Sequence, residues 1–415
     1  MMIASTSLAT VSAASTMSRS TTLHAVLSVT PQTVQIGQPV VADVHHSTLR
    51  SGTALRKVTV TWGDGKSTVL RSLSQTPLHR FAHTGHFTIK AVIADNKGRS
   101  SSAAVAEVVV PVQHVYWDLF YSGSTSHQLE YATAPLAAKS KYTDISGTAG
   151  NHLRCTAGMT TDTKGRLWIL SYPNRCSAPD TATIQVFNTP VLQSSAPALT
   201  FTLPGAGDDD LLVFDRVGNL WVEDDYGNIV YEFRGPFTTS RTLVPALTLS
   251  TGAVKPSGLA VDHRGDLFVA NLLSKNAKSI AVYHAPVSSS TVPTYLYGLT
   301  NPGGPTFDAQ GNLYAFTSTT KAPGPGVARY NANHLGPGAL PNVYDNAGLA
   351  GKSPYEASFA WDASGNLYMA DCGKHAAIRE YPLAFTAFSA HLAPIVNYTN
   401  ASLSSVGCAW GIVIH

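Results

Sequence analysis

The chain of 415 residues has few charged side chains. Lys and Arg number 28, Asp and Glu number 25, and the charged share of 13% is about half the usual one. Long charged helices and coiled coils need Glu and Lys in quantity, so both are excluded. Disordered chains carry more charge and fewer apolar residues than the 44% found here. A scattered net charge of +3 argues against a nucleic-acid binder, which has a clustered basic face.

Long hydrophobic runs are also missing. No stretch reaches the roughly 18 apolar residues of a transmembrane helix, so we expect no such helix. Residues 1–22 are rich in Ser, Thr and Ala but have neither a basic start nor a long apolar core. We expect this segment to be a disordered lead-in or the remnant of a signal peptide. The four cysteines form no Cys-x-x-Cys pair, which disfavours a structural zinc site.

Motifs of common enzyme classes are absent from the sequence. It contains no Gly-x-Ser-x-Gly, no His-Glu-x-x-His and no phosphate-binding Gly-x-x-x-x-Gly-Lys, and its 15 histidines do not cluster at metal-binding spacing. Arg264-Gly-Asp266 matches an integrin-binding tripeptide but lies in a turn that recurs along the chain. We therefore interpret it as a turn without a binding role.

Turn-forming residues and short apolar runs dominate instead, with 33 Gly and 24 Pro, and they predict an all-β protein. In residues 23–112, runs of period two predict strands at Ala25–Val29, Val40–Val44, Val58–Trp62, Phe87–Ala94 and Ala104–Val110. Turn signals such as Gly63-Asp64-Gly65 separate them. Short strands at this spacing favour a β-sandwich over residues 23–112.

Three motifs in this region resemble the polycystic kidney disease (PKD) domain family. They are Trp62-Gly-Asp-Gly65, the strand His83-Thr-Gly-His-Phe87, and the hairpin Asp95-Asn-Lys-Gly98, in that order. The resemblance implies an immunoglobulin-like sandwich that serves as an extracellular spacer or interaction module. Asp64 is interpreted as a turn former that bonds neighbouring amides, with metal ligation as the less favoured alternative.

The remainder, residues 113–415, contains an internal repeat. The phrase Asp-x-x-Gly-x-Leu-aromatic occurs five times, starting at Asp162, Asp215, Asp262, Asp308 and Asp362. The spacing is about 50 residues, and only strand signals lie between the copies, which is typical of propeller blades. Each repeat divides into four strands, with the Asp-x-x-Gly hairpin joining the first to the second.

Five such repeats leave a ring open, and the two ends of the region supply a sixth blade. The C-terminal run Val406–Ile414 matches a first strand, and His114–Tyr121 matches a second strand without its first. We therefore predict a six-bladed β-propeller closed by the C-terminal strand, which removes exposed strand edges.

This array resembles the NHL-repeat and gluconolactonase-like six-bladed propellers. The resemblance rests on Gly258–Asn271 and Trp361–Asp371, and covers about residues 115–415. It is specific for fold and weak for function, because function lies in sites grafted on scaffolds.

The cysteines occupy related places in the repeat. Cys155 and Cys408 share one position, while Cys176 and Cys372 both follow a second strand. We predict disulfides Cys155–Cys176 and Cys372–Cys408, although four cysteines allow three pairings. Disulfides would fit an extracellular setting, and the alternative is four free buried thiols.

Polar residues gather where first strands begin and second strands end, at one mouth of the expected channel. They are Asp210, Asp224, Asn271, Glu356 and Asp371. Such oxygen ligands suit Ca²⁺ or Mg²⁺. The resemblance implies a divalent cation at this place, with Asp210 matching the family's metal-binding Asp more securely than Glu356 or Asn271. The favoured alternative is that these side chains are simply hydrated.

Aromatic residues near the same rim form a second candidate site for a sugar or peptide. They are Tyr172, Tyr226, Phe316, Tyr355 and Trp410. Their large contact area suits stacking, with packing between blades as the alternative interpretation.

Three functions follow from these features. The first is a monomeric secreted or cell-surface protein that presents the propeller to a protein or carbohydrate ligand, with no nucleic-acid partner. The second is a divalent-metal hydrolase of gluconolactonase type, in which the metal polarises a carbonyl and a mouth carboxylate acts as base. The third is a purely structural envelope protein.

Overall fold

The structure, a computed structural model, is all-β and divides into two compact units, Met1–Pro111 and Val112–His415. It describes residues 21–34, 36–119, 128–134, 136–145, 153, 156–172, 181–192, 194–203, 211–250, 255–272, 278–317, 326–345, 358–362, 365–371, 377–382, 394, 396–400, 403 and 409–415. Among these residues, none of the helical segments has the length and apolar content needed to cross a membrane.

The first unit consists of two antiparallel sheets that share one core. The strands are β1 (Ser28–Thr30), β2 (Pro39–Asp43), β3 (Leu55–Thr61), β4 (Ser67–Leu70), β5 (Leu78–Arg80), β6 (Gly85–Asp95) and β7 (Ala104–Val110). One sheet has the order β1-β2-β5 and the other β4-β3-β6-β7. Alternate residues of both sheets, such as Val40, Val60 and Ile89, are fully buried between them, as the period-two pattern predicts.

Two strands of this unit, β4 and β5, are absent from the sequence-based expectation. Both are short, and each buries one side chain only, Leu70 in β4 and His79 in β5. A short, mostly polar strand gives too few alternations to be read as a pattern. The turn before β4 behaves as expected, because Asp64 Oδ1 accepts a hydrogen bond from the Lys66 amide at 3.1 Å.

His79 connects that turn to the core. Its Nε2 lies 2.8 Å from Asp64 Oδ2, and its ring stacks on Trp62 at 4.6 Å between centroids. Burial raises the pKa of the Asp64 carboxyl, but hydrogen bonds from Lys66 and His79 outweigh burial and hold that pKa below its usual value. The Trp-Gly-Asp motif thus belongs to the packing of the unit.

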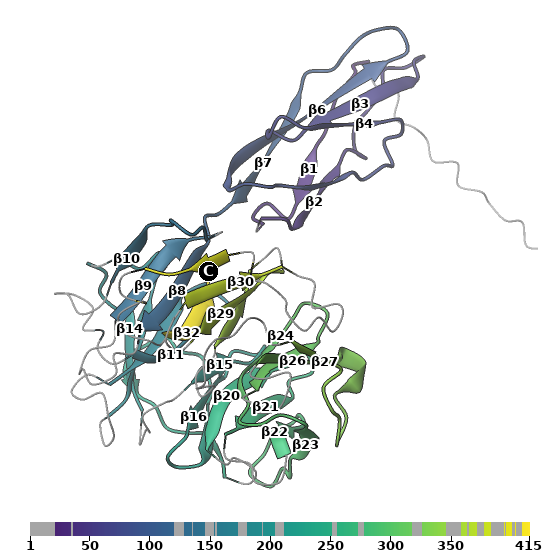
Figure 1. Cartoon of the computed structure of the whole chain (residues 1–415). Coiled ribbons are helices and arrows are strands. Elements are labelled where there is room, and N and C mark those ends of the chain that lie inside the picture. Colours follow the sequence, from purple (N-terminus) through teal and green to yellow (C-terminus); the bar gives the residue numbers. More distant parts are fainter. Residues whose placement is uncertain are drawn as a thin grey trace, which may run out of the picture. The chain divides into compact units, whose positions relative to one another are not determined.

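The described residues of the second unit form six sheets, each built around four antiparallel strands. Figure 1 labels strands from these sheets. The sheets are β32 (Ala409–Ile414), β8 (His114–Leu119), β9 (Gln128–Thr133) and β10 (Tyr142–Asp144); β11 (Thr156–Thr161), β12 (Leu167–Ser171), β13 (Thr183–Phe187) and β14 (Leu199–Thr202); β15 (Leu212–Phe214), β16 (Leu220–Asp224), β17 (Ile229–Phe233) and β19 (Leu247–Leu249); β20 (Pro256–Val261), β21 (Leu267–Asn271), β22 (Lys278–Tyr283) and β23 (Thr294–Tyr297); β24 (Gly303–Phe307), β25 (Leu313–Thr317), β26 (Gly326–Tyr330) and β27 (Val343–Asp345); and β28 (Phe359–Trp361), β29 (Leu367–Asp371), β30 (Ala377–Tyr381) and β31 (Val396–Tyr398). A short strand, β18 (Arg241–Thr242), adds to β14 in parallel.

The sheets are arranged like the blades of a propeller. Their first strands contact one another in succession, from β11 through β15, β20, β24 and β28 to β32, and β32 contacts β11 again. The expected pairing of the chain's last strand is confirmed, because β32 pairs with β8 antiparallel, with Ile412 opposite Trp117. Near the same sheet, Asn400 Nδ2 donates to the buried Glu130 Oε2 at 2.8 Å.

The repeated Asp-x-x-Gly turns are hairpins, as predicted. In the first of them, Asp162 Oδ1 accepts from the amides of Lys164 at 2.9 Å and Arg166 at 3.0 Å, and Gly165 has φ 76°. The glycines of the other four copies also have positive φ, between 83° and 90°. The hairpin joins the first and second strands of five sheets, so the repeat phrase marks the same joint each time.

Gly258 lies in the first strand of its sheet where neighbouring sheets approach closely. A Cβ at this position would lie 2.4 Å from Pro305 Cδ and 2.8 Å from the Gly304 amide nitrogen. We expect Gly258→Ala to destabilise the second unit by about 1–3 kcal/mol, because neither a proline ring nor a backbone can yield. Thermal unfolding measures the loss. Gly336→Ala is the control, since nothing lies within 4 Å of its Cβ; equal melting of both variants would contradict the prediction.

Candidate functional site

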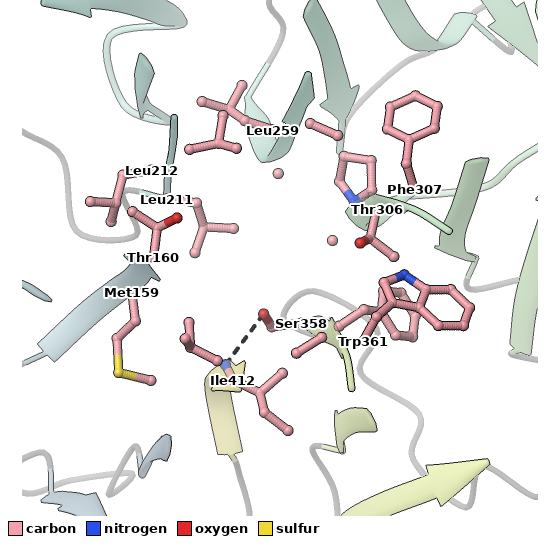
Figure 2. Close-up of a pocket in the computed structure, with 18 of the residues that line it drawn as sticks. Met159, Thr160, Leu211, Leu212, Leu259, Thr306, Phe307, Ser358, Trp361 and Ile412 are labelled. Atoms are coloured by element: carbon pink, nitrogen blue, oxygen red, sulfur yellow. Dashed lines mark hydrogen bonds between the residues drawn. The ribbon is translucent and has the colours of Figure 1, made fainter. Parts of the chain in front are cut away.

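The first strands of the six sheets surround a channel with a volume of about 360 Å³. Figure 2 shows labelled side chains of all six strands or their flanks arranged around this central space. A volume of this size lies within the range of small-ligand pockets. The channel is formed by separate segments of the chain, the first beginning at residue 159 and the last ending at residue 414. No single repeat therefore contains the whole site.

The lining is polar without being charged. Thr160, Thr161, Thr306 and Ser358 contribute hydroxyls, while leucines 211, 212 and 259 and Ile412 contribute apolar surface. None of the described residues that line the channel has a titratable side chain. Ser358 Oγ accepts a hydrogen bond from the Ile412 amide at 3.4 Å, which joins two neighbouring first strands (Figure 2). Such a lining offers hydrogen bonds and apolar contact to a neutral ligand.

The residues predicted at the channel mouth are only partly described. Asp210 and Glu356 lie outside the described residues, and Asp371 is described as the last residue of β29 but not in its side chain. Asp224 and Asn271 end β16 and β21, and are 8% and 1% exposed. Within the described part of the chain, no group of three or more His, Cys, Asp or Glu side chains could hold a metal ion.

The Asp224 carboxylate serves its own turn. Its Oδ1 accepts from the Gly227 amide at 2.7 Å, between β16 and β17. The next residue, Asp225, is 4% exposed, and its Oδ2 lies 3.8 Å from Lys255 Nζ. Asp224 and Asp225 are therefore engaged by contacts within the protein, one in its own turn and one with the next repeat.

The aromatic residues predicted for ligand stacking differ in exposure. Tyr172 is 1% exposed and Phe316 is 4% exposed, and each belongs to a hydrophobic cluster, so neither presents a ring face to a ligand. Tyr226, by contrast, is 65% exposed. Tyr355 lies outside the described residues, and Trp410 is described only as part of β32.

The predicted disulfides concern Cys155, Cys176, Cys372 and Cys408, and all four lie outside the described residues. The Arg-Gly-Asp tripeptide lies within them. Its Asp266 is 9% exposed, with Oδ1 accepting from the Ala285 amide at 2.8 Å and Oδ2 lying 2.9 Å from His284 Nδ1. A carboxylate so engaged has little capacity for a partner, in agreement with the turn interpretation.

Two buried carboxylates that are not among the predicted site residues connect neighbouring strands near the channel. Asp118 in β8 accepts hydrogen bonds from the Gly411 amide and, at 3.1 Å, from Thr156 Oγ1. Glu223 in β16 accepts from the Gly258 amide at 2.9 Å through Oε2. Both are 0% exposed. Asp118 and Glu223 occupy the same position in the second strands of their sheets. The sequence feature that could have identified them is a carboxylate within an otherwise apolar strand.

No protein-family model and no curated protein sequence matches the chain. Solved structures do resemble it. A candidate 6-phosphogluconolactonase from Bacteroides uniformis shares 12% identity over 67% of this chain and 80% of its own, with a TM-score of 0.45. The PQQ domain of pyranose dehydrogenase from Coprinopsis cinerea shares 12% identity over 63% of this chain and 88% of its own, with a TM-score of 0.44.

An auxiliary nutrient binding protein from Bacteroides ovatus also resembles the chain, with 14% identity over 88% of this chain, 85% of its own and a TM-score of 0.35. Proteins with a common scaffold carry many unrelated activities. The propeller-like arrangement is therefore argued from the strand pairings of this chain. The function of the protein is argued from its own side chains.

Proposed function

We propose that the protein binds a neutral carbohydrate in the channel, and that it acts outside the cell or at the cell surface. In this proposal the six sheets form a closed six-bladed propeller of NHL type, and the PKD-like first unit is a spacer. The observation that carries the proposal is the channel itself. It is about 360 Å³ in volume, and the described residues of its lining offer hydroxyls and apolar side chains without a charged group.

A sugar suits this lining for chemical reasons. Thr160, Thr306 and Ser358 are half-buried and come from three different sheets, so their hydroxyls approach a ligand from several directions. The leucines between them give contact to the C–H faces of a sugar ring. A charged ligand would lose its hydration in the channel and would find no opposite charge among the described residues of the lining.

The test is a screen of neutral oligosaccharides by isothermal titration calorimetry. We expect Thr306→Trp to weaken binding at least about tenfold, because the indole fills the space that the ligand needs. Val292→Trp is the control, since it adds the same ring at a residue that is 77% exposed and distant from the lining. Unchanged binding by Thr306→Trp, or no binding of any neutral oligosaccharide, would reject the proposal.

The alternative function is a divalent-metal hydrolase with ligands at the mouth. The observation on its side is that Asp224 and Asn271 are both last residues of second strands in neighbouring sheets, as is Asp371 in a third. Calorimetric titration with Ca²⁺ separates the two functions. Saturable Ca²⁺ binding that Asp210→Asn removes would favour the hydrolase over the carbohydrate-binding protein.

A further inference from the structure

A second cavity lies between two repeat hairpins, away from the channel, and we name it the aromatic groove. Its volume is about 380 Å³. The hairpins β11–β12 and β15–β16 form its sides, together with the segment that follows β17. It is lined by Asp162, Thr163, Lys164, Arg166, Trp168, Phe214, Val217, Gly218, Asn219, Gly235, Pro236, Phe237 and Thr238.

Three aromatic rings form the apolar wall of this groove. The Trp168 ring meets Phe214 edge to face at 4.9 Å and Phe237 at 5.2 Å between centroids. Phe214 is only partly buried, and Val217 at the rim is 83% exposed. Trp168 and Phe237 are 0% and 7% exposed, so the aromatic cluster meets solvent at Phe214, where a flat apolar group could add a further ring contact.

The charged groups of the groove leave one cation unpaired. Asp162 is occupied, because its Oδ2 accepts from Trp168 Nε1 at 3.0 Å and pairs with Arg166 Nη2 at 2.7 Å. Lys164 is exposed, and its ammonium forms no ion pair among the described residues. The groove therefore combines an aromatic wall with an available positive charge.

The corresponding cavity between the fourth and fifth sheets provides an internal comparison. It is smaller, about 250 Å³, and its lining includes Asp262, Arg264, Asp266 and Phe268. Arg264 occupies the hairpin position of Lys164, but Asp266 occupies that of Arg166. One arginine therefore lies with two carboxylates and two histidines, His263 and His284, in the smaller cavity, whereas Lys164 and Arg166 lie with one carboxylate in the aromatic groove. The two cavities share a scaffold and differ in charge and aromatic content.

We propose that the aromatic groove is a second ligand site, for a small aromatic carboxylate whose ring packs against Phe214 and whose carboxylate pairs with Lys164. This site is separate from the channel and does not depend on the carbohydrate proposal. The hydroxyls of Thr163 and Thr238 are additional hydrogen-bond donors within the lining. A net positive groove disfavours the cationic analogues of such a ligand.

Calorimetric titration of the full chain with indole-3-acetate tests the site. We expect a dissociation constant on the order of 1 mM or below, as for a ligand of this size. Indole-3-acetamide, the neutral analogue, should bind about tenfold more weakly, and so should indole-3-acetate to Lys164→Glu. Arg264→Glu is the matched control at the same hairpin position of the other cavity, and its affinity should stay within about twofold.

A second measurement locates the ligand. The indole N–H resonance of Trp168, identified by its absence in Trp168→Phe, should shift on addition of indole-3-acetate. The proposal is overturned if indole-3-acetate does not bind at millimolar concentration, or if Lys164→Glu and Arg264→Glu weaken binding equally. Binding that leaves the Trp168 resonance unmoved places the ligand elsewhere and also overturns it.

Discussion

Removal of residues 409–415 is expected to unfold the second unit while the first unit stays folded. The deleted strand, β32, is the first strand of its sheet, and it also contacts β11 and β28 of the two neighbouring sheets. Ile412 and Val413 are 3% and 8% exposed. Burial of these two side chains contributes roughly 3–6 kcal/mol, and lost backbone hydrogen bonds add about 1 kcal/mol each. A domain is typically stable by only about 5–15 kcal/mol.

Differential scanning calorimetry of the truncated chain measures this effect. We expect the transition of the second unit to disappear, because the truncation exposes the edge of β8 and the buried side chain of Trp117. The transition of the first unit should remain, since none of its sheets includes β32. The control is the full-length double variant Ile412→Ala/Val413→Ala, which keeps the strand backbone and should melt early but cooperatively. A truncated chain that retains both transitions would refute the closing role of β32.

Replacing Asp118 with Ala is expected to cost the second unit about 2–6 kcal/mol. The substitution leaves the buried Gly411 amide and the Thr156 hydroxyl without their carboxylate acceptor, and each such loss costs about 1–3 kcal/mol. Gly411 lies in β32 and Thr156 in β11, which belong to neighbouring sheets. The loss therefore weakens the contact between these two sheets as well as the pairing of β32 with β8.

Thermal melting detects this loss as a fall of roughly 5–20 °C in Tm for a unit of this size. Asp118→Asn is the matched control, because the amide oxygen still accepts from Gly411 and the variant should lose less than half as much. Glu223→Ala should behave like Asp118→Ala, since Glu223 accepts from the Gly258 amide in the neighbouring sheet. An Asp118→Ala protein with the same Tm as the wild type would show that the carboxylate is dispensable.

The local features of this protein were predictable because their interactions are local. Asp162 accepts from amides two and four residues later, and Gly165 adopts the φ that few other residues tolerate. The same short phrase therefore produces the same hairpin wherever it recurs. In the third copy, for example, the second strand Leu267–Asn271 begins at the Leu of the repeat phrase.

The pairing of the chain's last strand was also predictable, although it is remote in sequence. The C-terminal run matches the first strand of a repeat but lacks the hairpin that follows it, and the segment at His114 matches a second strand but lacks a first strand before it. Together they make one complete repeat, and β32 does pair with β8. By contrast, β4 and β5 were missed, because a strand with one buried side chain has no period to detect.

The sequence by itself determined the all-β class, the repeated hairpins and the partner of the terminal strand, because each rests on local alternation or on contacts within one repeat unit. Only the tertiary structure decided which side chains meet across repeats. Asp118 and Gly411 are 293 positions apart, yet a carboxylate and an amide face each other there. The channel and the aromatic groove likewise combine residues from separate sheets. Charge is scarce in this chain, yet Asp118 and Glu223 each place a buried carboxylate between neighbouring sheets, and no local pattern reveals their partners.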